Sequence, residues 1–336
     1  MSTDTGHNST SGDGTWAYGN EEKLIDFGYR AMHGSIVLAK EVTKAYYGQS
    51  AKYNYYSGCS TGGRQGLKDI QLYPEDFDGV VAGSPAWWTS HLQPWTIKLG
   101  SYVHDLCIHI IPTDMHYSYN LPNNSAHFIP PALFPAIGAE VLAQCDGSDG
   151  LIDSIISDPN ACDFYPEALL CPANVTNATA QLAAGCLTSA QINTLYYIYN
   201  DYVDVNQTFV FPHLELGSEA QWPVLLSGAT NSPNPLGTEY VQDFLQLGPQ
   251  WPWQDFNYSI VQLADQTDPG NATAGDFDLS PFMQKGGKLL QYHGYADALI
   301  ATGSSIYFYK HVLRTLLPKG IDLDDFYRFF LVPGMQ

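Results

Sequence analysis

Basic residues are scarce in this sequence of 336 residues. Lys and Arg number 14 against 34 Asp and Glu, so the formal net charge at pH 7 is −20. Binding of nucleic acid and of anionic lipid depends on Lys and Arg that neutralise phosphate groups, so this balance argues against both partners. Long hydrophobic runs are also missing, since no window approaches the roughly 18 apolar residues of a membrane span. We therefore expect a globular protein without a membrane segment, whose partner is neutral or cationic.

A signal peptide is missing too, because residues 1–7 contain neither a basic region nor an apolar run. Two other features nevertheless predict a secreted glycoprotein. The first is a set of seven N-x-[ST] sequons, at Asn8, Asn123, Asn174, Asn177, Asn206, Asn257 and Asn271. The second is the gathering of four of the six cysteines in one loop-rich stretch, as in an oxidised framework: Cys145, Cys162, Cys171 and Cys186. Six cysteines allow many pairings, so their spacing leaves the connectivity open. Either secretion is wrong or the true start precedes Met1.

Hydrophobic periodicity predicts an α/β fold with a parallel sheet. Residues 21–47 carry apolar side chains at mostly helical spacing, with acids in the first turn and Gly48 just past the end, and predict one long amphipathic helix. A β-prone run at 53–56, a helical pattern that reaches Leu72 and an apolar run at 76–83 follow, which is the alternation of a parallel sheet. The same alternation returns later in the sequence. It predicts a strand at 286–297, a helix at 305–316 and a strand at 326–332.

The stretch between these two parts has a different composition. Residues 87–284 are aromatic, rich in proline and weakly periodic, although 189–202 predict a helix, and they hold five cysteines and six of the sequons. We interpret them as a lid domain inserted into an α/β-hydrolase catalytic domain that consists of 1–86 and 285–336.

The sequence around Ser60 fits the G-x-S-x-G pattern of a nucleophile elbow. In that turn a strand passes so sharply into a helix that small residues must flank the serine, here Gly58 and Gly62. Two glycines around a serine also occur in ordinary loops, so the predicted strand before Ser60 and helix after it carry the interpretation. Ser60 is the candidate nucleophile.

An α/β-hydrolase also needs an acid and a histidine, in that order after the serine. Asp297 follows a predicted strand and is the candidate acid, although a loop aspartate that caps the next turn is an equal alternative. After Asp297 the only histidine is His311, which lies among aromatic residues at helical spacing, and we interpret it as a packing or surface residue. The last predicted strand runs into Gln336 without a histidine after it.

The other histidines are better explained as structural residues with satisfied hydrogen bonds. A zinc cluster of His104, His109 and His116 is a distant alternative, because no H-E-x-x-H or paired Cys-x-x-Cys accompanies it.

A glycine-bent loop presents three carboxylates within eight residues: Asp146, Asp149 and Asp153. Oxygen clusters of this kind bind Ca²⁺, with backbone carbonyls that complete the coordination. An acidic, solvated turn is the alternative, and the spacing does not match the EF-hand pattern.

These residues belong to motifs that resemble the tannase and feruloyl esterase family of secreted, mostly fungal esterases. The motifs are Ser2-Thr3-Asp4-Thr5-Gly6-His7, Asp26-Phe27-Gly28-Tyr29-Arg30-Ala31, Gly58-Cys59-Ser60-Thr61-Gly62-Gly63-Arg64-Gln65-Gly66, Tyr73-Pro74-Glu75-Asp76-Phe77-Asp78-Gly79 and Tyr292-His293-Gly294-Tyr295-Ala296-Asp297. The resemblance implies an α/β-hydrolase with a large lid that cleaves feruloyl or galloyl esters through an acyl-enzyme, with a small-molecule or plant-polymer phenolic ester as substrate.

Carried over by motif, Ser60 is the nucleophile, Asp297 orients the histidine, and the N–H of Thr61, which follows the nucleophile, is the expected oxyanion donor. The resemblance implies a structural calcium ion held by the side chains of Asp146, Asp149 and Asp153 and the backbone oxygens of Leu151 and Ile155. It also implies the disulfides Cys145–Cys162 and Cys171–Cys186, and it leaves Cys107 without a role.

The resemblance places a His-Cys pair directly after the Pro-Gly-Met segment, where this sequence ends at Gln336. The catalytic histidine and the disulfide partner of Cys59 are therefore expected outside the sequence, and the chain resembles a segment cut at both ends. Without its base, a serine triad keeps only residual catalysis. A noncatalytic phenolic-ligand or glycan-binding protein of the same fold is the alternative function. Tryptophans of the lid are candidates to stack on a phenolic ring, with core packing as the alternative: Trp87, Trp88, Trp95, Trp251 and Trp253.

Overall fold

A computed structural model describes residues 3–10, 12–101, 103–104, 117–118, 121, 124–226 and 232–336. The side chain of His104 and all of Cys107, His109, His116 and Asn123 lie outside the described part, and so does the zinc alternative. The helices are α1 (Glu21–Ile25), α2 (Ala31–Tyr47), α3 (Thr61–Leu72), α4 (Thr89–Ser101), α5 (Phe134–Cys145), α6 (Ala178–Ala184), α7 (Ser189–Ile198), α8 (Trp222–Leu226), α9 (Pro235–Glu239), α10 (Tyr258–Thr267), α11 (Ser280–Gln284) and α12 (Gly303–Leu316). The strands are β1 (Tyr55–Cys59), β2 (Gly79–Gly83), β3 (Val103–His104), β4 (Tyr117–Ser118), β5 (Tyr202–Val203), β6 (Phe209–Phe211), β7 (Lys288–Gly294) and β8 (Tyr327–Val332).

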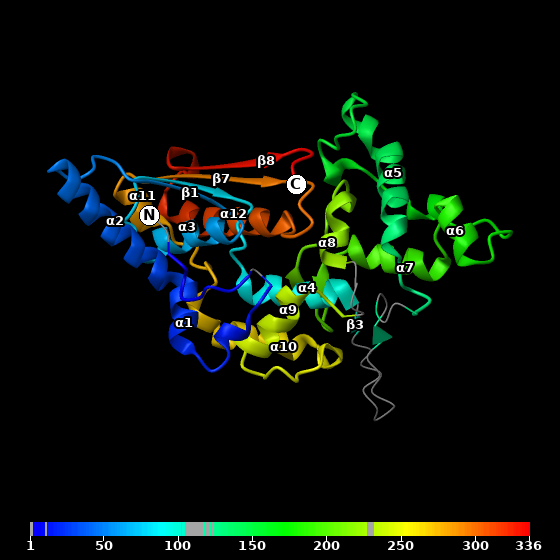
Figure 1. Ribbon diagram of the computed structural model, residues 1–336. Coiled ribbons are helices and arrows are strands. Elements are labelled where there is room, and N and C mark those ends of the chain that lie inside the picture. Colours follow the sequence, from blue (N-terminus) through cyan, green and yellow to red (C-terminus); the bar gives the residue numbers. More distant parts are fainter. Residues whose placement is uncertain are drawn as a thin grey trace.

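The central sheet has four parallel strands in the order β1-β2-β7-β8. Helices α3 and α12 cover one of its faces, as Figure 1 shows, and their apolar side chains pack on the strands. The α/β fold predicted from the alternation of strands and helices is confirmed. Because all four strands are parallel, the loops after them meet at one edge of the sheet.

The large insertion lies between two strands that are neighbours in the sheet. β2 pairs directly with β7, although residues 84–287 separate them in the sequence. Figure 1 shows α5, α6, α7 and α8 beyond the carboxyl ends of the strands, away from α2. The insertion therefore stands over the edge where the loops of a catalytic site are expected.

Two hydrophobic cores organise the described residues. One lies between the sheet, α3 and α12, and it also takes in Ala274, Leu279 and Phe282 from the end of the insertion. The other is built from lid residues between 92 and 264, and it includes Ala298, Ile300 and Ala301 from the loop after β7. Each core thus contains residues from both parts of the chain, while the domain division at 87 and 284 stays a prediction.

The helix predicted for residues 21–47 is continuous but not uniform. A π-helical turn, η2 (Asp26–Arg30), joins α1 to α2, and Gly48 ends α2 in the left-handed region at φ 72°. The helix predicted for 189–202 ends at Ile198, because Tyr202 pairs with Phe211 in the two-stranded sheet of β5 and β6. None of the described helices has the length and hydropathy needed to cross a bilayer.

Candidate active site

Ser60 lies at a sharp turn between β1 and α3. Its backbone has φ 61° and ψ −122°, a conformation that is costly for a residue with a side chain. The turn is held by three backbone hydrogen bonds, in which Ser60 N–H donates to Gly83 O at 3.0 Å and Ser60 O accepts from Arg64 N at 3.1 Å and Ala86 N at 3.1 Å. Ser60 is exposed. These are the features of a strained strand-to-helix elbow that presents a serine hydroxyl.

Of the glycines near Ser60, Gly58 and Gly63 are required by close approach, whereas a Cβ atom on the predicted Gly62 would meet only the hydroxyl of Tyr56, at 3.4 Å. A Cβ atom on Gly58 would lie 2.5 Å from the hydroxyl of Tyr56 and 2.7 Å from the carbonyl oxygen of Gly62. A Cβ atom on Gly63 would lie 2.6 Å from Gly83 O, on the neighbouring strand. α3 can therefore follow the strand at this distance only with glycines at these positions.

Thr61 is the first residue of α3. An N–H at this position has no carbonyl partner inside its own helix and carries part of the positive end of the helix dipole. A helix N-terminal N–H group thus lies directly after Ser60.

Asp297 lies three residues after β7, at the same edge of the sheet as Ser60. β2 stands between β1 and β7, so two strand spacings, about 10 Å, separate the strands that lead into Ser60 and Asp297. One carboxylate oxygen of Asp297, Oδ1, accepts from the N–H groups of Leu299 at 2.9 Å and Ile300 at 3.0 Å. This is the turn-capping contact weighed as the alternative for Asp297, and it leaves Oδ2 for another partner.

The other oxygen of Asp297 faces His293, whose Nε2 lies 3.4 Å from Oδ2. Burial alone would raise the pKa of Asp297, but the hydrogen bond and charge of His293 and the two backbone N–H groups hold that pKa below its ordinary value. Asp297 is therefore a carboxylate at neutral pH.

His293 is fully buried and structural. Its Nε2 lies 2.9 Å from Ile300 O and its Nδ1 lies 2.7 Å from Ser305 Oγ. Both ring nitrogens thus have protein partners in a loop that fixes Asp297. His311 packs on Tyr307 with ring centroids 3.8 Å apart, and its Nδ1 lies 2.8 Å from Tyr307 O, which confirms its packing role.

The segment after β8 packs against the loop that carries Asp297. Met335 O accepts from Ala296 N at 3.0 Å, and a Cβ atom on Gly294 would lie 2.1 Å from this same oxygen. Gly334, at φ 65°, lies close to Ile155 of the acidic lid loop. The serine elbow, the acid loop and the end of β8 thus share one edge of the sheet.

Two cavities border this edge. One, of about 290 Å³, is lined by Thr61 and Arg64 and by the aromatic rings of Trp16, Phe27 and Phe244. The other, of about 620 Å³, lies between α5 and the residues next to Asp297 and the chain end, Tyr295, Ala296, Gly334 and Gln336. The larger cavity is lined by residues of the loop that carries Asp297, whereas the smaller one is lined by Thr61, the residue after Ser60.

The aromatic lining of the smaller cavity was not expected from the sequence. Trp87 and Trp95 are buried in the two cores, and Trp88, Trp251 and Trp253 pack against the lid core, so the packing alternative describes all five candidates. Trp16 comes instead from an N-terminal segment that has loop composition. Its ring stacks on His7 at 4.2 Å, and the family motif that contains His7 was the available signal.

The acidic lid loop is closed by its own hydrogen bonds. Both oxygens of the buried Asp146 accept backbone N–H groups, from Asp153 at 3.2 Å and Ser154 at 3.0 Å. Asp149 Oδ1 accepts from Leu151 N at 2.9 Å. The exposed carboxylates and carbonyls of this loop are all oxygen donors, which is the chemistry that suits a hard cation such as Ca²⁺.

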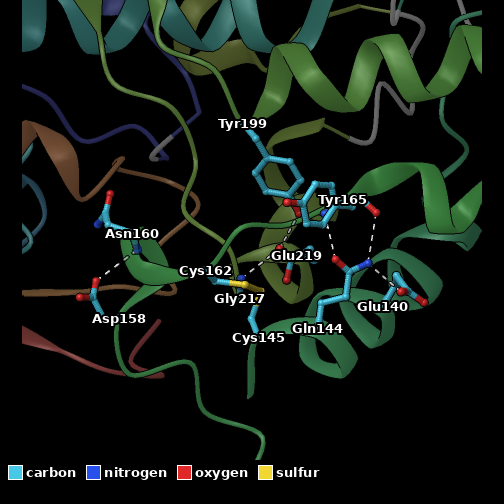
Figure 2. Close-up of a disulfide and its surroundings, with 10 residues drawn as sticks. All are labelled: Glu140, Gln144, Cys145, Asp158, Asn160, Cys162, Tyr165, Tyr199, Gly217 and Glu219. Atoms are coloured by element: carbon cyan, nitrogen blue, oxygen red, sulfur yellow. Dashed lines mark hydrogen bonds between the residues drawn. A yellow bond between two sulfur atoms is a disulfide. The ribbon is translucent and has the colours of Figure 1, made fainter. Parts of the chain in front are cut away.

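Two disulfides stabilise the lid, Cys145–Cys162 and Cys171–Cys186, and these are the pairs that the family resemblance implies. Figure 2 shows the first of them beside Gln144, which bonds Glu140 and both backbone polar groups of Tyr165. Cys59 is a free, exposed cysteine within the described residues.

The structure has a strained serine elbow and a carboxylate at one edge of a parallel sheet, and a long insertion between neighbouring strands. These features define an α/β-hydrolase. A family model described as tannase and feruloyl esterase matches residues 1–212 and 253–336, and the chain belongs to this family. The chain is 36% identical over 337 residues to a probable feruloyl esterase B-1 of Aspergillus oryzae, and 36% identical over 338 residues to one of Aspergillus terreus.

The crystal structure of feruloyl esterase B from Aspergillus oryzae has a TM-score of 0.84 at 35% identity and covers 96% of this chain. A tannin acyl hydrolase from Aspergillus niger shares the fold, with a TM-score of 0.72 and 23% identity over 94% of the chain. The two sequence relatives align over the whole chain, which spans 57% and 59% of their own lengths. It spans 60% and 58% of the two solved structures.

Proposed function

We propose that the complete protein is a serine carboxylic ester hydrolase that cleaves feruloyl or galloyl esters through an acyl-enzyme. The observation that carries this proposal is the strained backbone of Ser60, at the same sheet edge as the ionised Asp297. Strain of this kind persists only where the surrounding structure holds it, and it is common at catalytic sites. The names of the relatives, feruloyl esterase and tannin acyl hydrolase, support the substrate class.

In this mechanism Ser60 Oγ attacks the ester carbonyl carbon. Its proton passes to the histidine that the family resemblance places directly after Gln336, and Asp297 orients that histidine and stabilises its charge. The N–H of Thr61 donates to the oxyanion. The intermediate collapses, the alcohol leaves with the proton from the histidine, and water then hydrolyses the acyl-enzyme and restores Ser60.

The cavity beside Thr61 supports an aromatic acyl group. Trp16, Phe27 and Phe244 contact one another there with ring centroids 5.2 to 5.5 Å apart, and such edges and faces suit a phenolic ring. Glu239 also lines the cavity, and burial raises its pKa.

The test is to label the full-length protein with a phosphonate ester and to locate the adduct by tandem mass spectrometry. We expect the adduct on Ser60, and we expect Ser60→Ala to abolish it. Ser57→Ala is the matched control, because Ser57 is an exposed serine on the same strand and its loss should leave labelling unchanged. Labelling that persists in Ser60→Ala would overturn the mechanism, and binding of a phenolic ligand without labelling would favour the noncatalytic alternative.

We also propose that the lid loop holds a structural calcium ion. The side chains of Asp146, Asp149 and Asp153 and the backbone oxygens of Leu151 and Ile155 would bind it, and the ion would neutralise three carboxylates within one short loop. The hydrogen bonds of Asp146 support this proposal, because they already close the loop around those donors.

Secretion remains part of the proposal, and the sequons support it. Among the described ones, five lie at exposed asparagines: Asn8, Asn174, Asn177, Asn206 and Asn271. Asn257 is half-buried and its side-chain amide donates to Asp255 O at 3.1 Å, which makes it the poorest acceptor for a glycan.

A further inference from the structure

A second cluster of titratable side chains lies at the opposite end of the sheet from Ser60. His33 comes from α2, Asp69 from the last turn of α3, and Asp76 from the loop that leads into β2. Nine residues of helix separate Ser60 from Asp69, which corresponds to about 13 Å along α3. The cluster is therefore separate from the candidate active site.

The three side chains converge. One ligand atom from each, an imidazole nitrogen or a carboxylate oxygen, lies within 4.8 Å of the other two. Bonds of about 2.1 Å in a tetrahedral zinc site place ligand atoms about 3.4 Å apart, so small side-chain rotations would complete the geometry.

Asp69 supplies the independent observation. Its side chain is only 3% exposed, and neither carboxylate oxygen has a hydrogen-bond partner among the described residues. A buried carboxylate without a partner is costly, and buried charges are normally paired or bound to a metal. Among the described residues, none donates a hydrogen bond to the carboxylate of Asp69, so both of its oxygens are open to a ligand.

The other two residues are oriented for binding. Asp76 accepts from Lys40 Nζ at 2.9 Å through Oδ1, which holds the carboxylate with Oδ2 toward His33 at 2.7 Å. The imidazole of His33 is stacked on Tyr73 at 3.6 Å with an interplanar angle of 11°. Supporting contacts of this kind fix the direction of metal ligands, and the part-exposed His33 provides a path from solvent.

We propose that His33, Asp69 and Asp76 form a binding site for a divalent transition-metal ion. The imidazole nitrogen is a borderline donor that suits Zn²⁺ better than Ca²⁺, and zinc also binds carboxylate oxygens, so zinc is the ion we assign. The ion bridges α2, α3 and the loop before β2, and its role is structural. This site is distinct from the oxygen-only loop of the lid.

The test is equilibrium dialysis of the full-length protein against Zn²⁺ in a buffer that contains excess Ca²⁺, with bound zinc measured by mass spectrometry. We expect Asp69→Asn to bind one zinc equivalent fewer than the wild type, and Zn²⁺ to raise the melting temperature of the wild type but not of this variant. Asp69→Asn keeps the shape of the side chain, so it should fold without metal. His33→Gln, at a half-buried position on α2, is the second variant and should lose the same equivalent.

The matched control is His213→Gln. His213 also lies between two acids, with Asp201 Oδ1 at 2.6 Å from Nδ1 and Glu215 Oε2 at 3.8 Å from Nε2, but these carboxylates face opposite sides of the ring. Its replacement should leave the zinc content unchanged. Equal zinc uptake by the wild type, Asp69→Asn and His33→Gln would overturn the proposal, and it would mean that burial, which raises the pKa of Asp69, keeps this side chain protonated instead.

Discussion

The two carboxylate oxygens of Asp297 have different partners. Oδ1 caps the turn that follows it, while Oδ2 is directed at the buried ring of His293. A turn-capping aspartate and a triad acid were alternatives in the sequence, but the contacts are compatible with both roles in one residue, because a carboxylate oxygen can accept more than one hydrogen bond. We therefore expect the orientation of Asp297 to depend on His293, although His293 takes no proton from the substrate.

Glu219 is a buried acid whose protonation should affect the stability of the fold. It is buried beside Tyr199, whose hydroxyl donates to Glu219 Oε1 at 2.6 Å, and Gly217 N donates to the same oxygen at 3.0 Å (Figure 2). Burial raises the pKa of Glu219 above its ordinary value. The folded state thus binds the proton more tightly than the unfolded state, so stability is lost as the pH rises from about 4.5 through the raised pKa.

We predict that Glu219→Gln raises the melting temperature at pH 8 and that the gain disappears at pH 4, because the amide oxygen keeps both hydrogen bonds without the buried charge. Thermal melts across this pH range measure it. Glu167→Gln is the control, since Glu167 accepts a hydrogen bond from Tyr196 at an exposed site and the bond lowers its pKa. This control should not gain stability at pH 8. A loss of stability in Glu219→Gln at pH 8 would contradict the argument.

At the scale of elements, the backbone of η2 contacts the backbone of the segment before α11, at Gly270. A Cβ atom on Gly28 would lie 1.9 Å from Gly270 O, so the two backbones touch at this point. The buried guanidinium of Arg64 then bonds Gly28 O, Phe27 O and Ala272 O at 2.9 to 3.1 Å. One side chain of α3 thus joins the N-terminal helix and the end of the insertion.

Gly28 and Gly34 make a matched pair for this contact. We predict that Gly28→Ala destabilises the protein by about 2 to 3 kcal/mol, because the backbone must move apart and the bonds of Arg64 weaken. Gly34 lies in α2 with nothing within 4 Å of its missing Cβ, so Gly34→Ala should stabilise by about 0.5 to 1 kcal/mol. Urea unfolding of both variants measures the difference. Equal effects would show that the contact at Gly28 carries no energy.

At the scale of the whole molecule, the lid and the sheet are joined at the edge where the candidate site lies. Ala298, Ile300 and Ala301 come from the loop after Asp297 but are buried in the lid core. The acidic lid loop also reaches the end of β8, where a Cβ atom on Gly334 would lie 3.2 Å from Ile155. The order of the lid therefore influences both the acid loop and the segment that follows the last strand.

The calcium proposal gives the prediction at this scale. Removal of calcium with EDTA should lower the melting temperature of the metal-loaded protein, because three carboxylates are then left to repel one another in a loop that both parts of the fold share. Asp149→Asn and Asp153→Asn should reduce this shift. Asp163→Asn, which changes an exposed lid aspartate outside the loop, should leave it unchanged. A melt that EDTA does not alter, with Asp149 and Asp153 intact, would count against the site.

Local patterns in the sequence predicted much of this fold. The order of strands and helices, the end of α2 at Gly48 and the elbow at Ser60 follow from periodicity and from residues whose backbone or side-chain size restricts the local conformation. Local patterns did not predict the π-helical turn at Asp26–Arg30. This turn contains Gly28, whose contact with Gly270 joins segments more than two hundred residues apart.

The sequence by itself thus determined the alternation of elements, the serine elbow and the acidic loop, since each depends on residues within a few positions of one another. Only the tertiary structure decided which rings line the cavity beside Thr61, which loop joins the lid core, and that His33, Asp69 and Asp76 meet. These contacts arise when distant segments bury apolar surface together, and the free energy of that burial belongs to the whole core and not to any local pattern.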